Sequence, residues 1–191
     1  MSVSPAPPIL LASTSPQRRA ILEQLGLPFE VVAPRYSEPA AADPVERAAG
    51  KARSVAADAG DRPVLGVDTE VRLDGRLLGK PENASAAETM LEALGGRRHE
   101  VVSGLCLLTP GWEERAEAVT AVWFRALTPR DLAAYAATGE WEGRAGGYAI
   151  QGAGASLVER IEGDYLNVVG LPAALLVRVL AERFAGLYGL G

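Results

Sequence analysis

Apolar residues follow two different periods along the chain, and this predicts both strands and helices. Short continuous apolar runs indicate buried strands, and apolar residues that recur every three or four positions indicate amphipathic helices. On this basis, strands are expected at 8–12, 63–67, 99–108, 117–127 and 155–161. Helices are expected at 16–25, 43–59, 85–94, 128–138 and 172–184.

Capping residues support the predicted helix starts. Ser15-Pro16 and Thr128-Pro129 each place a hydroxyl cap before a proline at the first helical position. Asp43-Pro44-Val45-Glu46 and Ser85-Ala86-Ala87-Glu88 have the spacing of a capping box. Four of the helices therefore have predicted N-termini.

Two pairs of neighbouring strands have no helix between them. Residues 70–78 indicate a hairpin that turns at Asp74-Gly75, and the strand at 117–127 follows the one at 99–108 directly. Parallel neighbours need a crossover connection, so these pairs make the sheet mixed. The prediction is an α/β or α+β fold with a mixed sheet and a cleft, treated as one domain over residues 1–191.

Length and composition set the class of protein. A chain of 191 residues with 48% hydrophobic residues is long enough to bury one good core, as one domain or as two closely joined lobes. It contains no apolar run of about 18 residues, and its start, MSVSPAPPILLAS, lacks the basic region and long apolar core of a signal peptide. We therefore expect a soluble, cytoplasmic protein with no membrane partner.

Cysteine and histidine each occur once, which limits the chemistry. Cys106 lies in the apolar run 101–108, so we expect a buried thiol without an internal disulfide. His99 alone excludes a multi-histidine metal site and a Ser/His triad with a spare base. Any metal must be held by oxygen, which favours Mg²⁺ or Mn²⁺.

The net charge of −5 argues against a protein whose main task is to hold a nucleic acid backbone, because such binding needs a broad basic surface. An anionic small molecule still suits the chain where a local cluster of Lys and Arg reverses the sign of the potential. No nucleic acid partner is expected.

The first candidate site lies where the strand at 8–12 gives way to the helix at 16–25. Free backbone N–H groups and the helix dipole favour an anion there, and hydroxyl and guanidinium groups would add charge-assisted hydrogen bonds to phosphate. The side chains concerned are Ser13, Thr14, Ser15, Gln17, Arg18 and Arg19. The alternative is that Ser15 only caps the helix and both arginines are solvated.

A carboxylate follows the strand at 63–67. Asp68 stands at the C-terminal end of this apolar strand, where open sheets bind ligands, and an Asp there binds a metal or takes a proton from water. The alternative is an Asp that only begins a turn. Glu38 and Glu70 would add oxygen ligands, although Glu70 also suits a solvent-facing strand position.

The chain has only two lysines among many arginines, Lys51 and Lys80. Lys80 follows the hairpin at 70–78, which is expected to fold it back towards Asp68. Lys51 shares the polar face of its helix with Arg47. An ammonium suits a compact phosphate contact, although a solvated lysine is the ordinary alternative for each.

Residues 143–154 are rich in glycine and hardly periodic, which indicates a loop. Such a loop lets backbone approach a ligand closely, and the amide of Gln151 is able to read a base edge. A flexible connector is the alternative. None of the four signals identifies a reaction by itself.

Together, these segments resemble the Maf family of nucleotide pyrophosphatases, once described as septum-formation inhibitors. The resemblance covers nearly the whole chain, and its three longest segments are LASTSPQRRAILEQLGLPFEVVAP, GVDTEVRLDGRLLGKP and GRAGGYAIQGAGASLVERIEGDYLNVVGLP. It implies an elongated α/β fold with a cleft between two lobes, similar to inosine-triphosphate pyrophosphatases, and a homodimer. It also implies metal-dependent hydrolysis of a nucleoside triphosphate to the monophosphate and pyrophosphate.

Carried over residue by residue, the resemblance implies that Asp68 is the general base and that Asp68 and Glu38 hold the metal. The positions that match the family's nucleotide and metal site are Ser13, Arg18, Arg19, Glu38, Lys51, Lys80 and Gln151. Ser15, Gln17 and Thr69 complete the predicted substrate-binding set.

Two positions depart from the family's pattern. Members that resemble dTTP/UTP pyrophosphatases carry an Asp-Thr pair, a Gln in the closing loop and an Arg directly after the Ser-Pro. Asp68-Thr69 and Gln151 agree, but Gln17 replaces that Arg. The leading interpretation is a preference for dTTP and UTP, with modified nucleotides as the alternative, and the 7-methyl-GTP branch fits less well. Glu70 stands where the family often has an aliphatic residue.

The predicted mechanism is in-line attack of water on the α-phosphorus, with cationic side chains neutralising the triphosphate and the departing pyrophosphate. Two alternatives stay open. One is a regulatory nucleotide-binding protein that restrains cell division and septum formation, with incidental hydrolysis. The other is a metal-dependent phosphoesterase, which would release orthophosphate.

Overall fold

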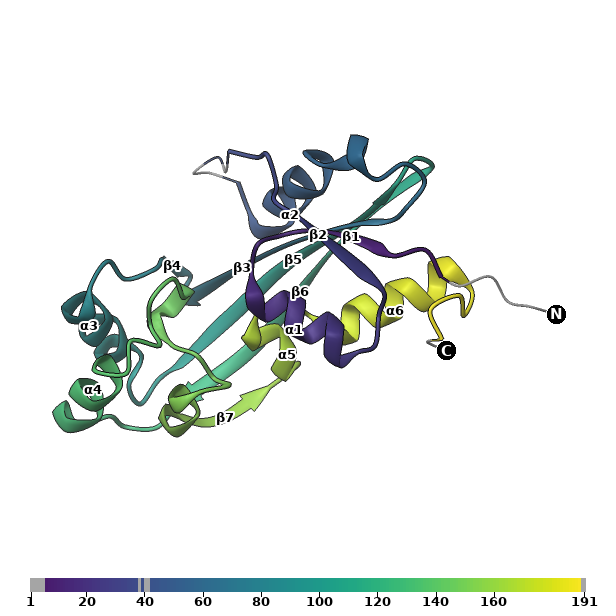
Figure 1. Cartoon of the computed structure of the whole chain (residues 1–191). Coiled ribbons are helices and arrows are strands. Elements are labelled where there is room, and N and C mark those ends of the chain that lie inside the picture. The colour runs from purple at the N-terminus through teal and green to yellow at the C-terminus, as the bar shows by residue number, and fades with distance from the viewer. Residues whose placement is uncertain (1–5, 38, 40–41, 190–191) are drawn as a thin grey trace. The chain divides into compact units, whose positions relative to one another are not determined.

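The computed structural model describes residues 6–37, 39 and 42–189, in which strands and helices alternate (Figure 1). The strands are β1 (Ile9–Ala12), β2 (Phe29–Val32), β3 (Val64–Leu73), β4 (Arg76–Leu78), β5 (Arg98–Thr109), β6 (Trp112–Phe124) and β7 (Val158–Glu162). The α-helices are α1 (Pro16–Gln24), α2 (Pro44–Arg53), α3 (Ala84–Leu94), α4 (Pro129–Ala136), α5 (Tyr165–Val169) and α6 (Ala173–Phe184). Short 3₁₀ turns lie at η1 (Ala56–Asp58), η2 (Ala145–Gly147) and η3 (Ala153–Leu157).

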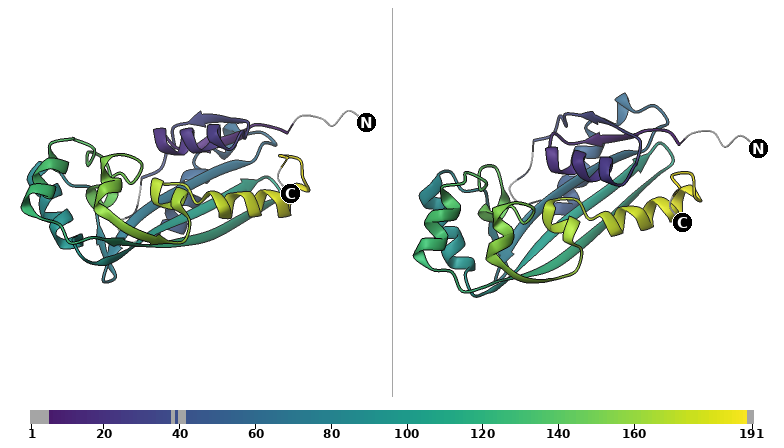
Figure 2. Two further views of the ribbon diagram at one scale, coloured as in Figure 1. Left: turned by 90° about the horizontal axis from the view of Figure 1, so that it is seen from below. Right: turned by 60° about the horizontal axis from the view of Figure 1, so that its bottom comes forward.

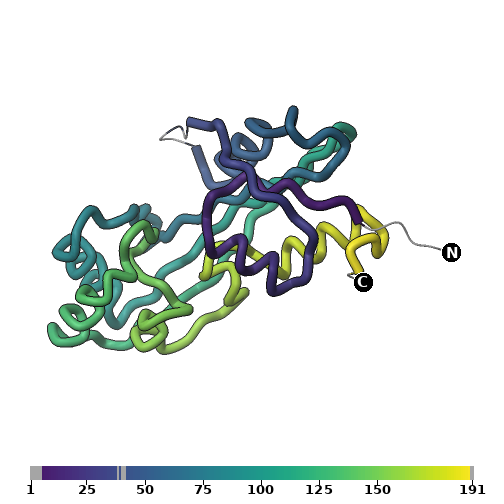
Figure 3. Tube along the Cα trace, viewed as in Figure 1, coloured from purple at the N-terminus to yellow at the C-terminus, as the bar shows by residue number. Residues whose placement is uncertain are grey.

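The described strands form one mixed sheet in the order β2-β1-β3-β5-β6-β7, with β4 paired to β3. β1 is parallel to both β2 and β3, as expected for strands joined through helices. The trace in Figure 3 follows the first of these crossovers, from β1 through α1 to β2. β4 is antiparallel to β3, and β7 is antiparallel to β6. The predicted mixed α/β sheet is confirmed.

The chain divides into two compact units. The first contains Met1–Asp68, Ser103–Ala118 and Gly170–Gly191, and the second contains Thr69–Val102 and Val119–Val169. Strands β3, β5 and β6 each contribute residues to both units. That the whole chain acts as one elongated domain with a cleft stays a prediction. None of the described helices is long and apolar enough to span a membrane.

In the first unit, α2 lies very close to its neighbouring strands because two glycines face it. A Cβ atom at Gly66 in β3 would stand 2.1 Å from the carbonyl oxygen of Ala48. A Cβ atom at Gly104 in β5 would stand 2.2 Å from the backbone of Pro44. Since both distances are far below van der Waals contact, any side chain at either glycine would push α2 outward.

The apolar core of the first unit is built mainly from small residues. Ala48, Ala49 and Ala52 of α2 are fully buried in the same cluster as Cys106. Cys106 is a buried free thiol, as predicted. Burial raises its pKa to about 12, so the thiol is protonated and unreactive at neutral pH.

The second unit has a core of larger side chains under two helices. α3 and α4 pack side by side, as both views in Figure 2 show. Aromatic rings fill the space beneath them: Phe124 and Tyr148 meet edge to face with ring centroids 4.9 Å apart. Thr128 and Asp131 form the capping box that starts α4, which confirms that predicted helix start.

The strand that carries Asp68 is longer than predicted. β3 runs from Val64 through Asp68 to Leu73, because its last residues pair with β4. Asp68 therefore lies inside the strand, and the predictions that it ends the strand or begins a turn are wrong.

Other element boundaries also differ from prediction. α3 is capped by Asn83, whose side chain accepts a hydrogen bond from the N–H of Ala86, instead of by Ser85; Asn caps a helix as well as Ser does. α2 ends at Arg53 because the backbone of Val55 leaves the helical region before the turn η1 begins. β6 begins at Trp112, five residues before the predicted start at 117, so the hairpin of β5 and β6 is longer than expected.

The sequence patterns missed β2 and α5. β2 has four residues without alternating burial, which leaves no strand period to detect. α5 has five residues and depends on tertiary contacts: the buried Asn167 side chain donates to the carbonyl of Val101 and to the hydroxyl of Thr120. Such long-range contacts leave no local signal.

Replacing Gly66 by Ala tests the close approach of α2. Because the new methyl group would meet backbone, which cannot rotate away, we expect the free energy of unfolding to fall by about 3 kcal/mol. Urea denaturation measures this change. Gly111→Ala is the control, because its Cβ would enter open space and should cost under about 0.5 kcal/mol. Equal unfolding of the two variants would contradict the close approach.

Candidate active site

One buried carboxylate in the first unit is held by two cations. Asp68 is 7% exposed in β3, and its Oδ2 atom accepts a hydrogen bond of 2.6 Å from Nε of Arg47. Its Oδ1 atom accepts one of 2.5 Å from Nζ of Lys51. Arg47 and Lys51 are four residues apart on α2, so they lie on one face of the helix.

The two cations decide the charge state of Asp68. Burial by itself would raise the pKa of Asp68, but Lys51 and then Arg47 outweigh burial, so the pKa lies below its ordinary value. Asp68 is therefore a stable anion at neutral pH, able to accept a hydrogen bond from water or to bind a cation.

The buried Arg47 was not among the predicted site residues. Its Nη1 atom also donates to the carbonyl of Ala42, just before the helix cap Asp43. The spacing of four residues to Lys51 was the signal in the sequence that could have identified it. The alternative of a solvated Lys51 is wrong, because only 12% of its side chain is exposed.

The start of α1 forms a second polar cluster in the first unit. Ser15 caps the helix by accepting from the N–H of Arg18, and its hydroxyl donates to Oε1 of Gln17 at 3.0 Å. The hydroxyl of Ser13 accepts from the N–H of Ser15 and, at 3.1 Å, from Nη1 of Arg18. Nε of Arg18 donates to the carbonyl of Gly170 at 2.9 Å.

This cluster unites four predicted site residues at one helix N-terminus. The guanidinium of Arg18 is oriented by two partners and is not fully solvated, so that alternative is wrong for Arg18. Arg19 differs, because 64% of its side chain is exposed and it pairs with Glu23 one turn later on the helix surface.

The second unit contains the predicted residues Thr69, Lys80 and Gln151. Lys80 and Gln151 are exposed, and their two segments meet where the N–H of Gly146 donates to the carbonyl of Gly79 at 3.1 Å. A Cβ atom at Gly146 would stand 2.9 Å from Val71, so glycine permits this contact. The loop is thus joined to the segment before Lys80 by a backbone hydrogen bond.

Two tyrosines hold the loop that carries Gln151. The hydroxyl of Tyr148 hydrogen-bonds Nε2 of the buried His99 at 2.8 Å. The hydroxyl of Tyr135 accepts from the N–H of Ala149 at 2.9 Å. Burial, with a smaller effect of Arg98, lowers the pKa of His99 to about 4, so the imidazole is neutral.

Of the two further predicted oxygen ligands, Glu70 and Glu38, the structure describes Glu70. Glu70 is 7% exposed, and Nε of Arg72 donates to its Oε1 atom at 2.5 Å, so the solvent-facing alternative is wrong. Glu38 lies outside the described residues. Tyr36, which precedes it by two positions, packs over Gly50 of α2, where a Cβ atom would stand 2.2 Å from the ring.

A divalent metal fits this structure only in part. The carboxylate of Asp68 is the hard oxygen ligand that Mg²⁺ and Mn²⁺ prefer. Both of its oxygens face cations, however. Within the described ranges, no three His, Cys, Asp or Glu side chains gather closely enough to hold a metal ion. Further ligands would have to come from Glu38, water or the substrate.

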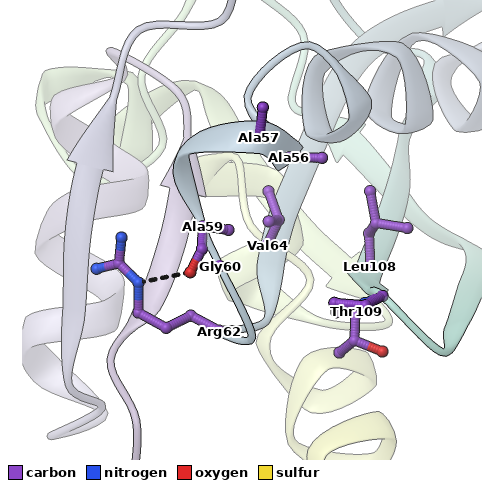
Figure 4. A pocket seen from close by; sticks show the side chains of 9 residues that line it. Ala56, Ala57, Ala59, Gly60, Arg62, Val64, Leu108 and Thr109 are labelled. Atoms are coloured by element: carbon purple, nitrogen blue, oxygen red, sulfur yellow. Dashed lines mark hydrogen bonds between the residues drawn. The ribbon is translucent and has the colours of Figure 1, made fainter.

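The first unit also contains a cavity of about 390 Å³, which Figure 4 shows from close by. Small apolar side chains line most of it, and the guanidinium of Arg62 donates to the carbonyl of Ala59 and pairs with Glu30. The lining residues include none of the predicted site residues, so this cavity is not the predicted nucleotide site.

The family described as Maf-like protein matches residues 8–183 of the chain. The chain belongs to the Maf family. The match includes Asp68, Lys51, the start of α1 and the loop of Gln151, so every cluster described above lies in the part of the chain that the family shares.

Three proteins similar to this Maf family member are each named dTTP/UTP pyrophosphatase. The protein of Nitratidesulfovibrio vulgaris is 48% identical over 94% of this chain and 90% of its own length. That of Deinococcus radiodurans is 43% identical over 100% of both chains. That of Moorella thermoacetica is 49% identical over 91% of this chain and 93% of its own length.

Among solved structures, the Ham1 protein of Staphylococcus aureus shows a weaker likeness to this Maf family member. The TM-score is 0.42 and the sequence identity 16%, over 62% of this chain and 72% of that chain.

The neutral, buried His99 predicts how stability depends on pH. Its pKa is about 4 in the folded chain and 6.5 unfolded, so the stabilisation is complete above pH 6.5 and is lost as pH falls towards 4. The loss should reach about 3 kcal/mol.

Denaturation of the wild type and His99→Gln at several pH values between 7 and 4 measures this loss as a difference between the two proteins. Gln has no titratable group but retains a partner for Tyr148. Because the chain has one histidine, NMR of its ring gives the pKa directly. An identical pH dependence in both proteins would disprove the assignment to His99.

Proposed function

We propose that this protein hydrolyses nucleoside triphosphates to the monophosphate and pyrophosphate, with a preference for dTTP and UTP. The observation that carries the proposal is a buried, ionised carboxylate, Asp68, held by Lys51 and Arg47. It occurs in a Maf family chain that is 43–49% identical to three dTTP/UTP pyrophosphatases over at least 91% of its length.

In the proposed reaction, Asp68 orients a water molecule for in-line attack on the α-phosphorus and accepts its proton. The bond from that phosphorus to the bridging oxygen breaks, and pyrophosphate leaves. The low pKa of Asp68 supports the first part, because an anion accepts a hydrogen bond from water at neutral pH.

Cationic and polar side chains bind the substrate in this proposal. Ser13, Ser15 and Arg18 provide a helix N-terminus, hydroxyls and an oriented guanidinium, a combination that favours phosphate. Lys51 supplies a compact positive charge. The remaining proposed substrate-binding residues are Gln17, Arg19, Thr69, Lys80 and Gln151.

We also propose that the reaction needs Mg²⁺ or Mn²⁺, with Asp68 and Glu38 as protein ligands. The metal would supply Lewis-acid stabilisation of phosphate charge. Glu38 enters this proposal because it matches a position of the family's nucleotide and metal site. The cytoplasmic location and the homodimer remain predictions.

The alternative of a regulatory nucleotide-binding protein accounts less well for Asp68. Binding a triphosphate does not require an anion, which repels phosphate. A carboxylate placed between two cations in a buried position favours chemistry over binding alone.

Replacing Asp68 by Asn tests the reaction. Turnover of dTTP and UTP should fall at least about 1,000-fold, while triphosphate binding is retained because Lys51 and Arg47 keep their charge. Chromatography that separates monophosphate, pyrophosphate and orthophosphate measures turnover, and calorimetry measures binding.

Circular dichroism is needed as a control, since two buried cations without their anion destabilise a fold. Full turnover in folded Asp68→Asn protein would remove Asp68 from the mechanism. Orthophosphate as the product of the wild type would indicate a phosphoesterase.

Replacing Gln17 by Arg tests how substrate binding depends on this position, where the dTTP/UTP-type members of the family carry Arg. A guanidinium beside Ser15 would add a phosphate contact, so we expect KM to fall about fivefold for all triphosphates without a change in base preference. Gln24→Arg, at the exposed far end of α1, is the matched control and should leave KM unchanged. A shift in the ratio of dTTP to GTP turnover would instead assign position 17 to base recognition.

A further inference from the structure

In the proposed function, Arg47 holds Asp68 and contributes positive charge, but it makes no named contact with the substrate. We propose that Arg47 is a triphosphate-binding residue: it exchanges its hydrogen bond to Asp68 for one to a phosphate oxygen of the incoming nucleotide. Asp68 then becomes open to the metal only when nucleotide is present. This inference rests on the proposed function, because it names a further residue for the same substrate.

The helix that carries Arg47 is packed closely against the strand that carries Asp68. The close approaches at Gly66 and Gly104 hold α2 against β3 and β5, and its alanines are fully buried. Any separation of the two charges must therefore be a movement of side chains. A guanidinium on a flexible stem makes such a movement more easily than a packed helix does.

A second partner keeps Arg47 oriented when the first is exchanged. Its Nη1 atom donates to the carbonyl of Ala42, which is independent of Asp68. With this anchor retained, Nε can turn from a carboxylate oxygen to a phosphate oxygen. About a tenth of each side chain is exposed, 10% for Arg47 and 11% for Asp68, and the exchange requires a phosphate oxygen to reach this exposed part.

The charges favour joint entry of metal and nucleotide. Both oxygens of Asp68 face cations at 2.5 and 2.6 Å, and a divalent ion that came alone would be repelled by both. Phosphate oxygens attract Arg47 and Lys51, and a planar guanidinium suits phosphate well. Mg²⁺ typically binds one or two carboxylates together with substrate phosphates, which is the set this exchange would produce.

Binding experiments without turnover test the exchange. Calorimetry in EDTA measures the affinity of α,β-methylene-UTP for the wild type, Arg47→Met, Arg47→Lys and Arg53→Met. We expect the Met variant to bind the analogue about tenfold more weakly than the wild type and the Lys variant about threefold more weakly. Lys keeps the positive charge but lacks the several planar N–H donors of the guanidinium. Arg53→Met, on the same helix but in a surface pair with Glu113, should equal the wild type.

Electron paramagnetic resonance of Mn²⁺ without nucleotide gives the second readout. Arg47→Met should bind free Mn²⁺ about tenfold more tightly than the wild type, because one cation at Asp68 is gone. Circular dichroism shows whether each variant is folded. If Arg47→Met does not fold, the affinity of Arg47→Lys for the analogue decides whether Arg47 binds the triphosphate. Unchanged affinity of folded Arg47 variants for the analogue would show that Arg47 only clamps Asp68 and would overturn the inference.

The experiments distinguish a failure of the proposed exchange at Arg47 from a failure of the proposed hydrolysis. A wild type that binds the analogue but releases no pyrophosphate from UTP would contradict the proposed function, and the analogue titration would still decide the exchange. A wild type that hydrolyses UTP, with full analogue binding by Arg47→Met, would overturn the exchange alone.

Discussion

The contact of α2 with β3 and β5 at Gly66 and Gly104 sets the geometry of the first unit. A Cβ atom at either glycine would stand little more than 2 Å from the helix backbone, 2.1 and 2.2 Å respectively, so only glycine allows the contact. Because α2 lies this close, the side chains of Arg47 and Lys51 reach the carboxylate of Asp68 directly. The small core of the first unit and the charge state of Asp68 both follow from that distance.

Local charge matters more here than net charge. The chain is acidic overall, at −5, yet the carboxylate of Asp68 is surrounded by cations and the start of α1 carries an oriented Arg18. Cations grouped at particular points give an acidic protein the means to bind a triphosphate. An arginine that changes partner on binding would also link metal entry to substrate entry.

In the second unit, hydrogen bonds and aromatic packing support the loop that carries the predicted site residue Gln151. This glycine-rich loop is held by hydrogen bonds from a buried aromatic core, in which His99 and Tyr148 pair at 2.8 Å. Tyr135 adds a bond to the loop backbone. Gln151 thus stands close to hydrogen-bonded residues of the loop although it is itself exposed. Rigid support of an exposed polar group is what recognition of a nucleotide would require.

The sequence alone determined the features that depend on neighbouring residues. Helix caps at Ser15, Asp43 and Thr128, the turn at Asp74-Gly75 and the mixed sheet were all readable, because capping and turn preferences act within a few positions. The order of motifs also indicated the family. The cap at Asn83 was not predicted because Asn and Ser cap helices equally well, so the sequence offered two candidates. The early end of α2 and the short elements β2 and α5 were not predicted because the local preferences there were weak.

Only the tertiary structure decided which groups meet. Lys51 and Asp68 are 17 residues apart in sequence, and His99 and Tyr148 are 49 apart, so no local pattern could pair them. Burial likewise turned Arg47 and Glu70 from ordinary surface residues into paired interior charges. The physical reason is that ion pairing and desolvation depend on distances through space, which chain folding sets.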